Sequence, residues 1–227
     1  PRIHNAAFKD AAINSVFLPL LVKDLRGFME RMVRPLSREV DINFAGFAVT
    51  MPHKLSIIQF LDEIDETARL IGAVNTVRIK GASLKGYNTD AEGFITPLLK
   101  MFGSVKDARV AVLGAGGAAR ACLFALKSEG ASAAIFARDP GKGASLAEAF
   151  RAESHEMDGG ALGSFDIVVN ATPVGMIGTA DDLCVDLTPF SRIKVVYDLV
   201  TSAQPTPLIS GARAAGIKTI TGVEMLI

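Results

Sequence analysis

The sequence predicts an α/β fold of two domains, an N-terminal α/β domain in residues 1–102 and a parallel-sheet domain in residues 103–227. Two observations support this prediction. The 227 residues are 49% hydrophobic and 21% charged, which is typical of a globular chain that can bury a sizeable core. Short apolar runs alternate with segments of helical spacing, most regularly after Arg109, and this order favours βαβ units in a parallel sheet.

The N-terminal half contains apolar runs of strand length and segments in which charged and apolar residues recur at helical spacing. We expect strands in residues 16–22, 44–49, 73–79 and 83–86. We expect helices in residues 23–35, 53–70 and 91–102, the last of them starting after Asp90. Lys80 and Gly81 read as the turn between the third and fourth strands.

The C-terminal half begins at Arg109, where a continuous apolar strand leads into a glycine-rich turn. We expect strands in residues 110–113, 133–136, 166–170 and 195–199. We expect helices from the glycine-rich turn to about residue 129 and in residues 144–152. The boundary between the two domains is expected at residues 102–104.

The charge balance and the cysteines argue against several classes of function. Lys plus Arg and Asp plus Glu each total 24, so the formal net charge is zero and no nucleic-acid or membrane partner is expected. Cys122 and Cys184 form no CxxC pair, which argues against a disulfide framework or a metal site and favours a reducing cytoplasm. The sequence has no apolar run of roughly 18 residues that could span a bilayer. It starts at Pro1 without an initiator methionine, so we expect part of a longer protein.

A glycine-rich segment, Gly114-x-Gly116-x-x-Ala119, follows the apolar strand and opens the next helix. This is the context of the fingerprint that binds dinucleotides. The first glycine allows a tight turn, the second lets the backbone approach a pyrophosphate, and the small third residue lets the helix pack on the sheet. Free N–H groups at the helix start attract phosphate charge. The segment predicts a Rossmann-like NAD(P)-binding domain, and a purely structural turn is the alternative.

The residues after the second strand of this domain, 138–142, usually decide between NAD and NADP. Arg138 and Lys142 could hold a 2′-phosphate, which favours NADP. Asp139 could instead bind a ribose hydroxyl, which would favour NAD, or cap a turn with Pro140. We predict NADP as the cofactor, with NAD as the alternative.

Two polar segments of the N-terminal half are candidates for the site of chemistry. Lys54 ends a segment, residues 50–54, that reads as a helix start because Pro52 suits the first helical position. A lysine in a first helical turn opposes the helix dipole, so either a function or simple surface exposure must explain Lys54. Asp90 could cap the following helix or, with the two polar residues before it, bind a polyhydroxylated ligand.

Taken in order, these motifs resemble those of the shikimate dehydrogenase family, and the resemblance extends along almost the whole chain. Residues 50–54 resemble the family's Val-Thr-x-Pro-x-Lys segment, and residues 88–90 resemble its Asn-Thr-Asp segment. The resemblance implies that Lys54 and Asp90 are the catalytic residues. It implies that the substrate-binding residues are Thr50, Asn75 and Asn88.

The resemblance also covers the predicted cofactor site. Residues 114–119 resemble the family's Gly-Ala-Gly-Gly-Ala-Ala loop, and Arg138 falls on the arginine that binds the NADP phosphate. Residues 170–176 resemble its Asn-Ala-Thr-x-x-Gly-Met segment beside the nicotinamide, and residues 222–226 resemble its Gly-x-x-Met-Leu segment. The cofactor-binding residues so implied are Gly114, Ala115, Gly116, Gly117, Ala118, Arg138, Asn170, Thr172, Gly175, Met176, Val200, Gly222 and Met225.

The resemblance implies an N-terminal substrate domain and the reversible, NADP-dependent reduction of 3-dehydroshikimate to shikimate, a step of aromatic amino-acid biosynthesis. It implies a cytoplasmic enzyme with a small-molecule substrate, either monomeric or homodimeric, and it allows a fusion to a dehydroquinate dehydratase.

The sequence also departs from the family pattern. It begins after the family's Ser-x-Ser pair, so the N-terminal part of the substrate domain is expected to be missing. Thr201 replaces the family's usual tyrosine, and Asp139 replaces the threonine of its phosphate motif. Two alternative functions are an NAD-dependent quinate/shikimate dehydrogenase and a non-catalytic regulatory domain of the same fold.

Overall fold

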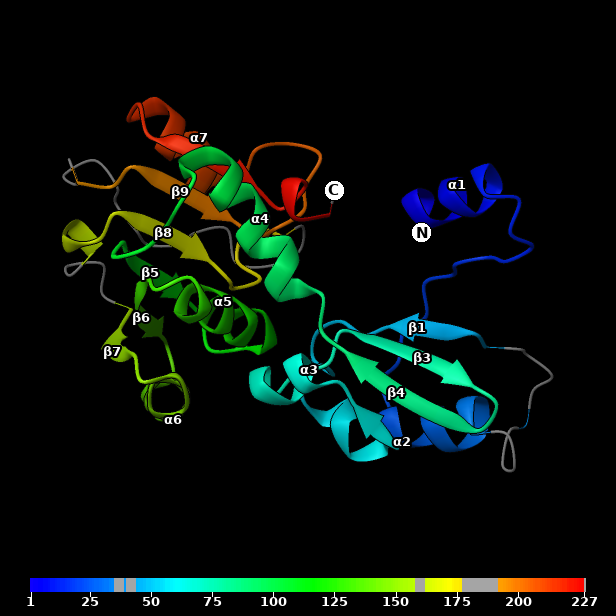
Figure 1. Ribbon diagram of the computed structural model, residues 1–227. Helices are drawn as coiled ribbons and strands as arrows, with labels where there is room; N and C mark the ends of the chain where they lie inside the picture. Colours follow the sequence, from blue (N-terminus) through cyan, green and yellow to red (C-terminus); the bar gives the residue numbers. More distant parts are fainter. Residues whose placement is uncertain (35–38, 40–43, 158–161, 177–191, 227) are drawn as a thin grey trace. The chain divides into compact units, whose positions relative to one another are not determined.

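The computed structural model describes residues 1–34, 39, 44–157, 162–176 and 192–226 of the chain. The chain divides into two compact units, residues 1–44 and residues 45–227. Figure 1 labels the helices and strands along the chain. The second unit carries both sheets that the described residues form, and with them the predicted α/β fold class is confirmed. The domain boundary expected at residues 102–104 stays a prediction.

The first unit consists of helical segments and extended chain. Its described helices are α1 (Arg2–Asp10), α2 (Leu25–Phe28) and the π-helix η1 (Met29–Val33). The carboxylate of Asp24 caps α2 by accepting a hydrogen bond of 3.0 Å from the Gly27 N–H. The helical prediction for residues 23–35 is therefore confirmed in its central part, whereas α1 lies where the sequence predicts no element.

The buried strand expected in residues 16–22 is wrong. None of these residues forms a strand, and their large apolar side chains are mostly exposed, with Leu21 at 87%. The backbone of Phe17 pairs with a side chain instead, because its N–H donates to Asn5 Oδ1 (2.7 Å) and its C=O accepts from Asn5 Nδ2 (3.0 Å). Pro19 lacks the N–H that a paired strand needs. An apolar run becomes a buried strand only where neighbouring strands pair with it.

The second unit begins with a four-stranded sheet in the order β1-β3-β4-β2. Its strands are β1 (Gly46–Ala48), β2 (Glu63–Ile64), β3 (Thr76–Lys80) and β4 (Ser83–Tyr87). β3 is antiparallel to β1 and β4, while β2 is parallel to β4. The strands predicted in residues 44–49, 73–79 and 83–86 are confirmed, and Gly81 makes the predicted turn with φ of +60°.

The single helix expected over residues 53–70 is wrong. The structure instead has a 3₁₀ helix η2 (Ser56–Phe60), then strand β2 and helix α3 (Glu66–Ile71). Asp62 interrupts the helical run because its N–H donates to the Leu84 C=O (3.0 Å) and its carboxylate accepts from the Leu84 N–H (2.8 Å). Asp65 then caps α3. Lys54 therefore lies in a turn and not in the first turn of an α-helix, so the helix-dipole argument for this lysine does not hold.

A six-stranded parallel sheet occupies the C-terminal part of the chain, in the order β10-β9-β8-β5-β6-β7. Its strands are β5 (Arg109–Leu113), β6 (Ser132–Ala137), β7 (Glu153–Glu156), β8 (Ile167–Asn170), β9 (Val195–Asp198) and β10 (Lys218–Thr221). The chain runs outward from β5 to β6 and β7, then returns to the other side of β5 with β8. The carboxyl ends of β5 and β8 are therefore the topological switch point, where open α/β sheets bind ligands.

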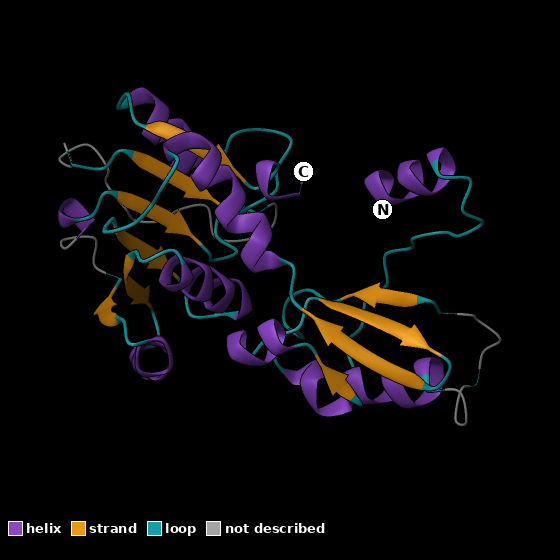
Figure 2. Cartoon of the chain, viewed as in Figure 1, coloured by secondary structure: helices purple, strands orange, loops and turns teal. Residues whose placement is uncertain are grey.

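Helices cover both faces of this parallel sheet (Figure 2). They are α4 (Asp90–Phe102), α5 (Gly117–Ser128), α6 (Pro140–Phe150) and α7 (Pro207–Ala214), with the 3₁₀ turns η3 (Leu162–Ser164) and η4 (Glu224–Leu226). One face buries residues such as Val112 and Tyr197 in a cluster with α4, α5 and α6. The other face buries Leu113 and Val196 in a cluster with α7. The predicted parallel sheet is confirmed, while α7, β7 and β10 are not among the predicted elements.

At the amino edge of the parallel sheet, the carboxylate of Asp166 joins the starts of three strands. Asp166 is 9% exposed and accepts a hydrogen bond of 3.0 Å from the Arg109 N–H. Its Oδ1 also lies 3.2 Å from Lys194 Nζ and 3.6 Å from Arg192 Nε. Burial raises the pKa of this carboxyl, but the Arg109 N–H and the two cations outweigh burial and lower it. Asp166 therefore has a structural role at the edge of the sheet opposite the switch point, where it connects the starts of β5, β8 and β9.

Candidate active site

The structure brings Lys54 and Asp90 together, although 36 positions separate them in the sequence. Lys54 Nζ lies 2.5 Å from Asp90 Oδ2, and the two side chains are 17% and 12% exposed. Lys54 lies in the turn after β1, and Asp90 is the first residue of α4, where the helix dipole favours its negative charge. The result is an ion pair that is shielded from most solvent but still partly exposed.

Two asparagine side chains hold Asp90 in place. Asn75 Nδ2 donates to Asp90 Oδ1 and to Thr89 Oγ1, each at 2.9 Å, and Asn75 Oδ1 accepts from the Thr89 N–H at 3.0 Å. Asn88 is 8% exposed. Its Oδ1 accepts from the Asp90 N–H and its Nδ2 donates to the Ala73 C=O, both at 2.9 Å. The amide groups of both asparagines are thus used to fix the start of α4.

The glycine-rich turn lies directly against Lys54. A Cβ atom added at Gly117 would lie 3.0 Å from Lys54 Cβ and 3.2 Å from Lys54 Cδ. Gly117 is the first residue of α5, and Gly116 is the N-cap of that helix. Because Gly117 has no side chain, the aliphatic stem of the lysine can approach the helix start this closely. The predicted proton-transfer pair and the predicted phosphate site are therefore neighbours.

The turn itself has the geometry that a pyrophosphate site requires. Gly114 has a φ of +111°, which favours glycine, and a Cβ at Gly116 would meet no atom within 4 Å, so a ligand could reach that backbone. The first N–H groups of α5 have no partner within their own helix, and the helix dipole favours an anion beside them. Ala119 is fully buried and packs the helix on the sheet, whereas Ala115 and Ala118 are half-buried. These residues fit the pyrophosphate of a dinucleotide.

The glycine-rich turn also touches the loop that follows β8. A Cβ at Gly114 would lie 3.1 Å from the carbonyl oxygen of Ala171 and 3.1 Å from Thr172 Cγ2. In the strand register, Leu113 is opposite Asn170, so the two loops leave neighbouring strands at the same level. The predicted phosphate turn and the predicted nicotinamide loop therefore meet at the switch point of the sheet.

Arg138 and Asp139 follow β6 at the carboxyl edge of the same sheet. The side chain of Arg138 is exposed and has no acidic partner within the described part of the chain. Asp139 caps α6, since its carboxylate accepts from the Lys142 N–H at 3.1 Å and pairs with Lys142 Nζ at 3.3 Å. The N–H and the charge of Lys142 lower the pKa of Asp139. Asp139 is thus engaged in helix capping, and Arg138 is available for a 2′-phosphate.

The side chain of Asn170 organises the loop after β8. It is fully buried. Its Oδ1 accepts from the N–H and the Oγ1 of Thr172 at 3.0 and 2.6 Å, and its Nδ2 donates to the Val174 C=O at 3.1 Å and to Asp198 Oδ1 at 2.8 Å. Met176, at the described end of this loop, is 45% exposed. The loop thus has a fixed base, and Met176 is accessible at the end of its described part.

Asp198 organises the loop after β9 in the same way. It is 1% exposed, its Oδ1 also accepts from the Val200 N–H at 3.0 Å, and its Oδ2 accepts from Thr206 Oγ1 at 2.5 Å. Burial raises the pKa of Asp198. Gly175, with a φ of +96°, packs on Thr206, because a Cβ there would lie 3.3 Å from Thr206 Cγ2. This contact brings the loops after β8 and β9 together.

The segment around Gly222 packs against the same loop after β9. A Cβ at Gly222 would lie 2.5 Å from the Leu199 carbonyl oxygen and 2.8 Å from the Val200 carbonyl carbon. Met225 approaches α4, where a Cβ at Gly93 would lie 2.7 Å from the Met225 carbonyl oxygen. The predicted cofactor segments after β5, β8, β9 and β10 are therefore packed on one another.

We expect Gly222→Ala to destabilise the protein, because the new Cβ would lie 2.5 Å from a backbone oxygen that cannot rotate away. Overpacking of this kind costs about 1–3 kcal/mol. Gly211→Ala is the matched control, since Gly211 lies in α7 with no atom within 4 Å of the Cβ position. There the gain in helix propensity should stabilise the protein by about 0.5–1 kcal/mol. Chemical denaturation followed by circular dichroism measures both changes, and a Gly222→Ala protein of unchanged stability would contradict this packing.

Sequence reasoning missed two residues of this region, Asp198 and Thr206. A signal for Asp198 is present, because it is a charged residue that ends an otherwise apolar strand. Thr206 precedes Pro207 and caps α7, which is the pattern of a helix start. Nothing in the spacing of the sequence links the two to Asn170, because that link exists only across neighbouring strands.

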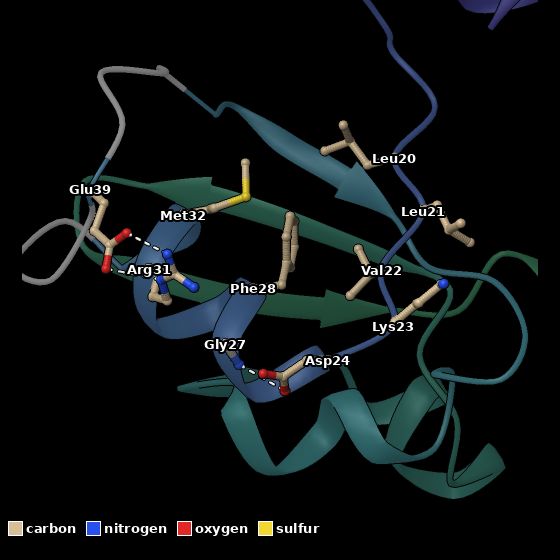
Figure 3. A pocket seen from close by; sticks show the side chains of 10 residues that line it. All are labelled: Leu20, Leu21, Val22, Lys23, Asp24, Gly27, Phe28, Arg31, Met32 and Glu39. Carbon is tan, nitrogen blue, oxygen red and sulfur yellow. Dashed lines mark hydrogen bonds and ion pairs between the residues drawn. The ribbon is translucent and has the colours of Figure 1, made fainter.

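A surface hollow of about 400 Å³ lies in the first unit and includes none of the predicted site residues (Figure 3). Arg31 and Glu39 form a two-bond ion pair beside it, at 2.9 and 2.8 Å. The lining residues are Leu20, Leu21, Val22, Lys23, Asp24, Gly27, Phe28, Arg31, Met32 and Glu39.

Within the described ranges, no helix is both long and apolar enough to cross a membrane. Among the same residues, no group of three or more His, Cys, Asp and Glu side chains is placed to hold a metal ion. Cys122 is buried in α5, and burial raises the pKa of its thiol. Cys184 lies outside the described residues.

Comparison with known proteins agrees with this arrangement. Residues 1–77 match the family model of the shikimate dehydrogenase substrate binding domain. The shikimate dehydrogenase (NADP(+)) of Citrifermentans bemidjiense is 38% identical over 239 residues, which cover 100% of this chain and 80% of that protein.

Solved structures are similar along the full chain. A crystal structure of a shikimate dehydrogenase in complex with NADP+ has a TM-score of 0.85 at 35% identity and covers 100% of this chain and 80% of its own. The shikimate 5-dehydrogenase from Thermus thermophilus, in complex with NADP(H) and shikimate, has a TM-score of 0.78 at 30% identity and covers 100% of this chain and 83% of its own. With relatives of 38% identity over its whole length, this chain belongs to the shikimate dehydrogenase family.

Proposed function

We propose that this chain is an NADP-dependent shikimate dehydrogenase, an oxidoreductase that reversibly reduces 3-dehydroshikimate to shikimate. The observation that carries the proposal is the position of the Lys54–Asp90 pair beside the glycine-rich turn, where a Cβ at Gly117 would lie 3.0 Å from Lys54 Cβ. Reduction of a ketone needs a hydride at carbon and a proton at oxygen of the same bond, so the proton donor must stand beside the cofactor site. Relatives that carry the name shikimate dehydrogenase (NADP(+)) support the same activity.

We assign the proton transfer to Lys54, and its ion pair with Asp90 supports this assignment. The glycine-rich turn and Arg138 would hold NADPH, which when bound would supply the hydride for the carbonyl carbon. The Lys54 ammonium donates a proton to the carbonyl oxygen as negative charge develops there, and in the reverse direction the amine takes the hydroxyl proton. Asp90, 2.5 Å away, orients the ammonium and stabilises its charge.

The three predicted substrate-binding residues take two different roles in this proposal. Asn75 and Asn88 use their amide groups to hold Asp90 and the chain before it, so they orient the carboxylate. Thr50 is exposed four positions before Lys54, so its hydroxyl is accessible to a hydroxyl group of the substrate.

The preference for NADP rests on Arg138. An exposed guanidinium without an acidic partner in the described chain can bind a 2′-phosphate through two parallel hydrogen bonds. Asp139, the residue that would favour NAD, has its carboxylate engaged by Lys142.

Initial rates of shikimate and quinate oxidation, each with NADP+ and with NAD+, test the proposal. We expect shikimate with NADP+ to give the highest kcat/KM of the four pairs. A higher kcat/KM for quinate with NAD+ would identify the NAD-dependent quinate/shikimate enzyme instead. Binding of NADP+ without turnover of any pair would identify a non-catalytic regulatory domain.

Four further expectations stay predictions. They are the domain boundary at residues 102–104, a monomeric or homodimeric state, a cytoplasmic location, and a fusion to a dehydroquinate dehydratase.

A further inference from the structure

The carboxyl edge of the parallel sheet contains a row of polar residues that lies between the loops assigned to the cofactor. In the strand register Asn170 is opposite Asp198, and Asp198 is opposite Thr221. Asn170 is fully buried and Asp198 is 1% exposed. Burying a carboxylate and an amide costs free energy unless each polar atom has a hydrogen-bond partner. The partners therefore indicate which parts of the chain these side chains hold in place.

The partners of Asn170 leave no group free for a ligand. A side-chain amide offers two donor hydrogens and two acceptor lone pairs. Both acceptor positions are used by Thr172, and the donor hydrogens are used by the Val174 C=O and by Asp198 Oδ1. The side chain therefore shapes residues 171–174, and it does so from a fixed position against Asp198.

The partners of Asp198 lie on the loop after β9. Oδ1 accepts from the Val200 N–H at 3.0 Å, and Oδ2 accepts from Thr206 Oγ1 at 2.5 Å. Thr206 in turn accepts from the Ile209 N–H at 3.3 Å and so fixes the start of α7. Gly175, on the loop after β8, packs on Thr206. One buried carboxylate thus sets two loops relative to each other.

We propose that Asp198, Asn170 and Thr206 form a positioning unit that sets the loops after β8 and β9 to receive the nicotinamide half of NADP. This inference rests on the proposed function. The unit acts through the loops, since its side chains are buried and bonded to backbone and to one another. The adenosine half is assigned to other residues. Arg138 follows β6, and the N-terminus of α5 follows β5. Loss of the unit should therefore affect one half of the cofactor and spare the other.

Two ligands separate the halves. NADP+ has both, whereas adenosine 2′,5′-bisphosphate has the 2′-phosphate and one 5′-phosphate but no nicotinamide. We expect Asp198→Ala and Thr206→Val to weaken NADP+ binding by about tenfold or more, because each leaves buried hydrogen-bonding groups without a partner and releases the loops. Binding of adenosine 2′,5′-bisphosphate should stay near the wild-type value. Calorimetric titration measures both, and kcat for shikimate oxidation should fall together with the affinity for NADP+.

Conservative variants test whether hydrogen bonding is the cause. Thr206→Ser keeps the hydroxyl, and Asp198→Asn keeps an acceptor toward Val200 and Asn170 and can donate to Thr206 Oγ1. We expect both to restore most of the affinity for NADP+. If Asp198→Ala does not fold, the pair Thr206→Val and Thr206→Ser carries the test alone.

Asp166→Ala is the matched control, because it removes another buried carboxylate from the same sheet at its amino edge. We expect it to lower the melting temperature without changing the ratio of the two ligand affinities. The inference would be overturned if Asp198→Ala and Thr206→Val leave the ratio of the NADP+ and adenosine 2′,5′-bisphosphate affinities unchanged, as Asp166→Ala is expected to do. A wild-type protein that binds neither ligand and does not oxidise shikimate would instead overturn the proposed function, whatever the variants do.

Discussion

Lys54→Ala lowers kcat for shikimate oxidation by about 10²- to 10⁴-fold, because it removes the group that transfers the proton. The ammonium lies 2.5 Å from Asp90 in a pair whose side chains are 17% and 12% exposed, so bulk water has limited access to replace it. The affinity for NADP+ should stay near that of the wild type, since the glycine-rich turn and Arg138 are unchanged. Steady-state rates and calorimetric titration measure the two effects.

Lys54→Met separates proton transfer from packing. Methionine keeps an unbranched stem against Gly117 but has no ammonium, so it should be as inactive as the alanine variant and more stable. Lys85→Ala is the matched control, because Lys85 also pairs with a carboxylate, Glu63, at 3.5 Å, but on the surface of the four-stranded sheet. An exposed pair contributes little, so kcat should not change. Turnover near the wild-type rate in both Lys54 variants would show that another group carries the proton.

Arg138→Ala weakens NADP+ binding by about 10- to 10²-fold, since hydrogen bonds to charged groups contribute about 1.5–3 kcal/mol. NAD+ lacks the 2′-phosphate, so its affinity should hardly change. The side chain is exposed and has no acidic partner among the described residues, so its removal should leave the fold intact. Titration with both cofactors gives the two dissociation constants.

Lys142→Ala tests the second cation near the predicted phosphate site. Lys142 is already paired with Asp139 at 3.3 Å and is 75% exposed, so we expect a smaller loss of NADP+ affinity than for Arg138→Ala. A larger loss would move the phosphate contact to Lys142. Equal losses for NADP+ and NAD+ in Arg138→Ala would mean that Arg138 does not read the 2′-phosphate.

The parallel sheet could be predicted from the sequence because its signals are local. Residues 110–113 of β5 are continuously apolar, since helices cover both faces of the sheet, and Gly114 marks the turn that must follow them. β7 escaped prediction because Glu153–Glu156 is an edge strand with exposed polar residues. A strand of that kind shows no apolar run.

The N-terminal elements depended on pairing that no local pattern reports. Residues 56–71 are helical at both ends, but Asp62 hydrogen-bonds to the backbone of Leu84. This bond separates the 3₁₀ helix η2 from α3. The apolar run 16–22 has the composition of a strand, yet Phe17 pairs with Asn5 instead. In both cases a partner more than ten positions away decided the outcome.

The candidate site divides in the same way. Lys54 and Asp90 could be named from the motifs that contain them, and the structure brings them together. Asn170 could be named as well, but only its hydrogen bonds support the positioning role proposed above, which a motif cannot distinguish from a ligand contact. Its partner Asp198 lies 28 positions further along the chain, and only the strand register reveals the pair.

The strand order also implies an order of events as the chain folds. β5 and β6 are joined through α5 alone, whereas β5 meets β8 across a longer separation, as in the bond between Arg109 and Asp166, 57 positions apart. Closing the longer loop costs more conformational entropy, so the parallel β5-α5-β6 unit should form early and β8 should dock late. The glycine-rich turn then exists before the loop that faces it. The adenosine half of a dinucleotide can therefore stabilise the β5-α5-β6 unit as soon as it has formed, whereas the nicotinamide half can stabilise the protein only after β8 has docked.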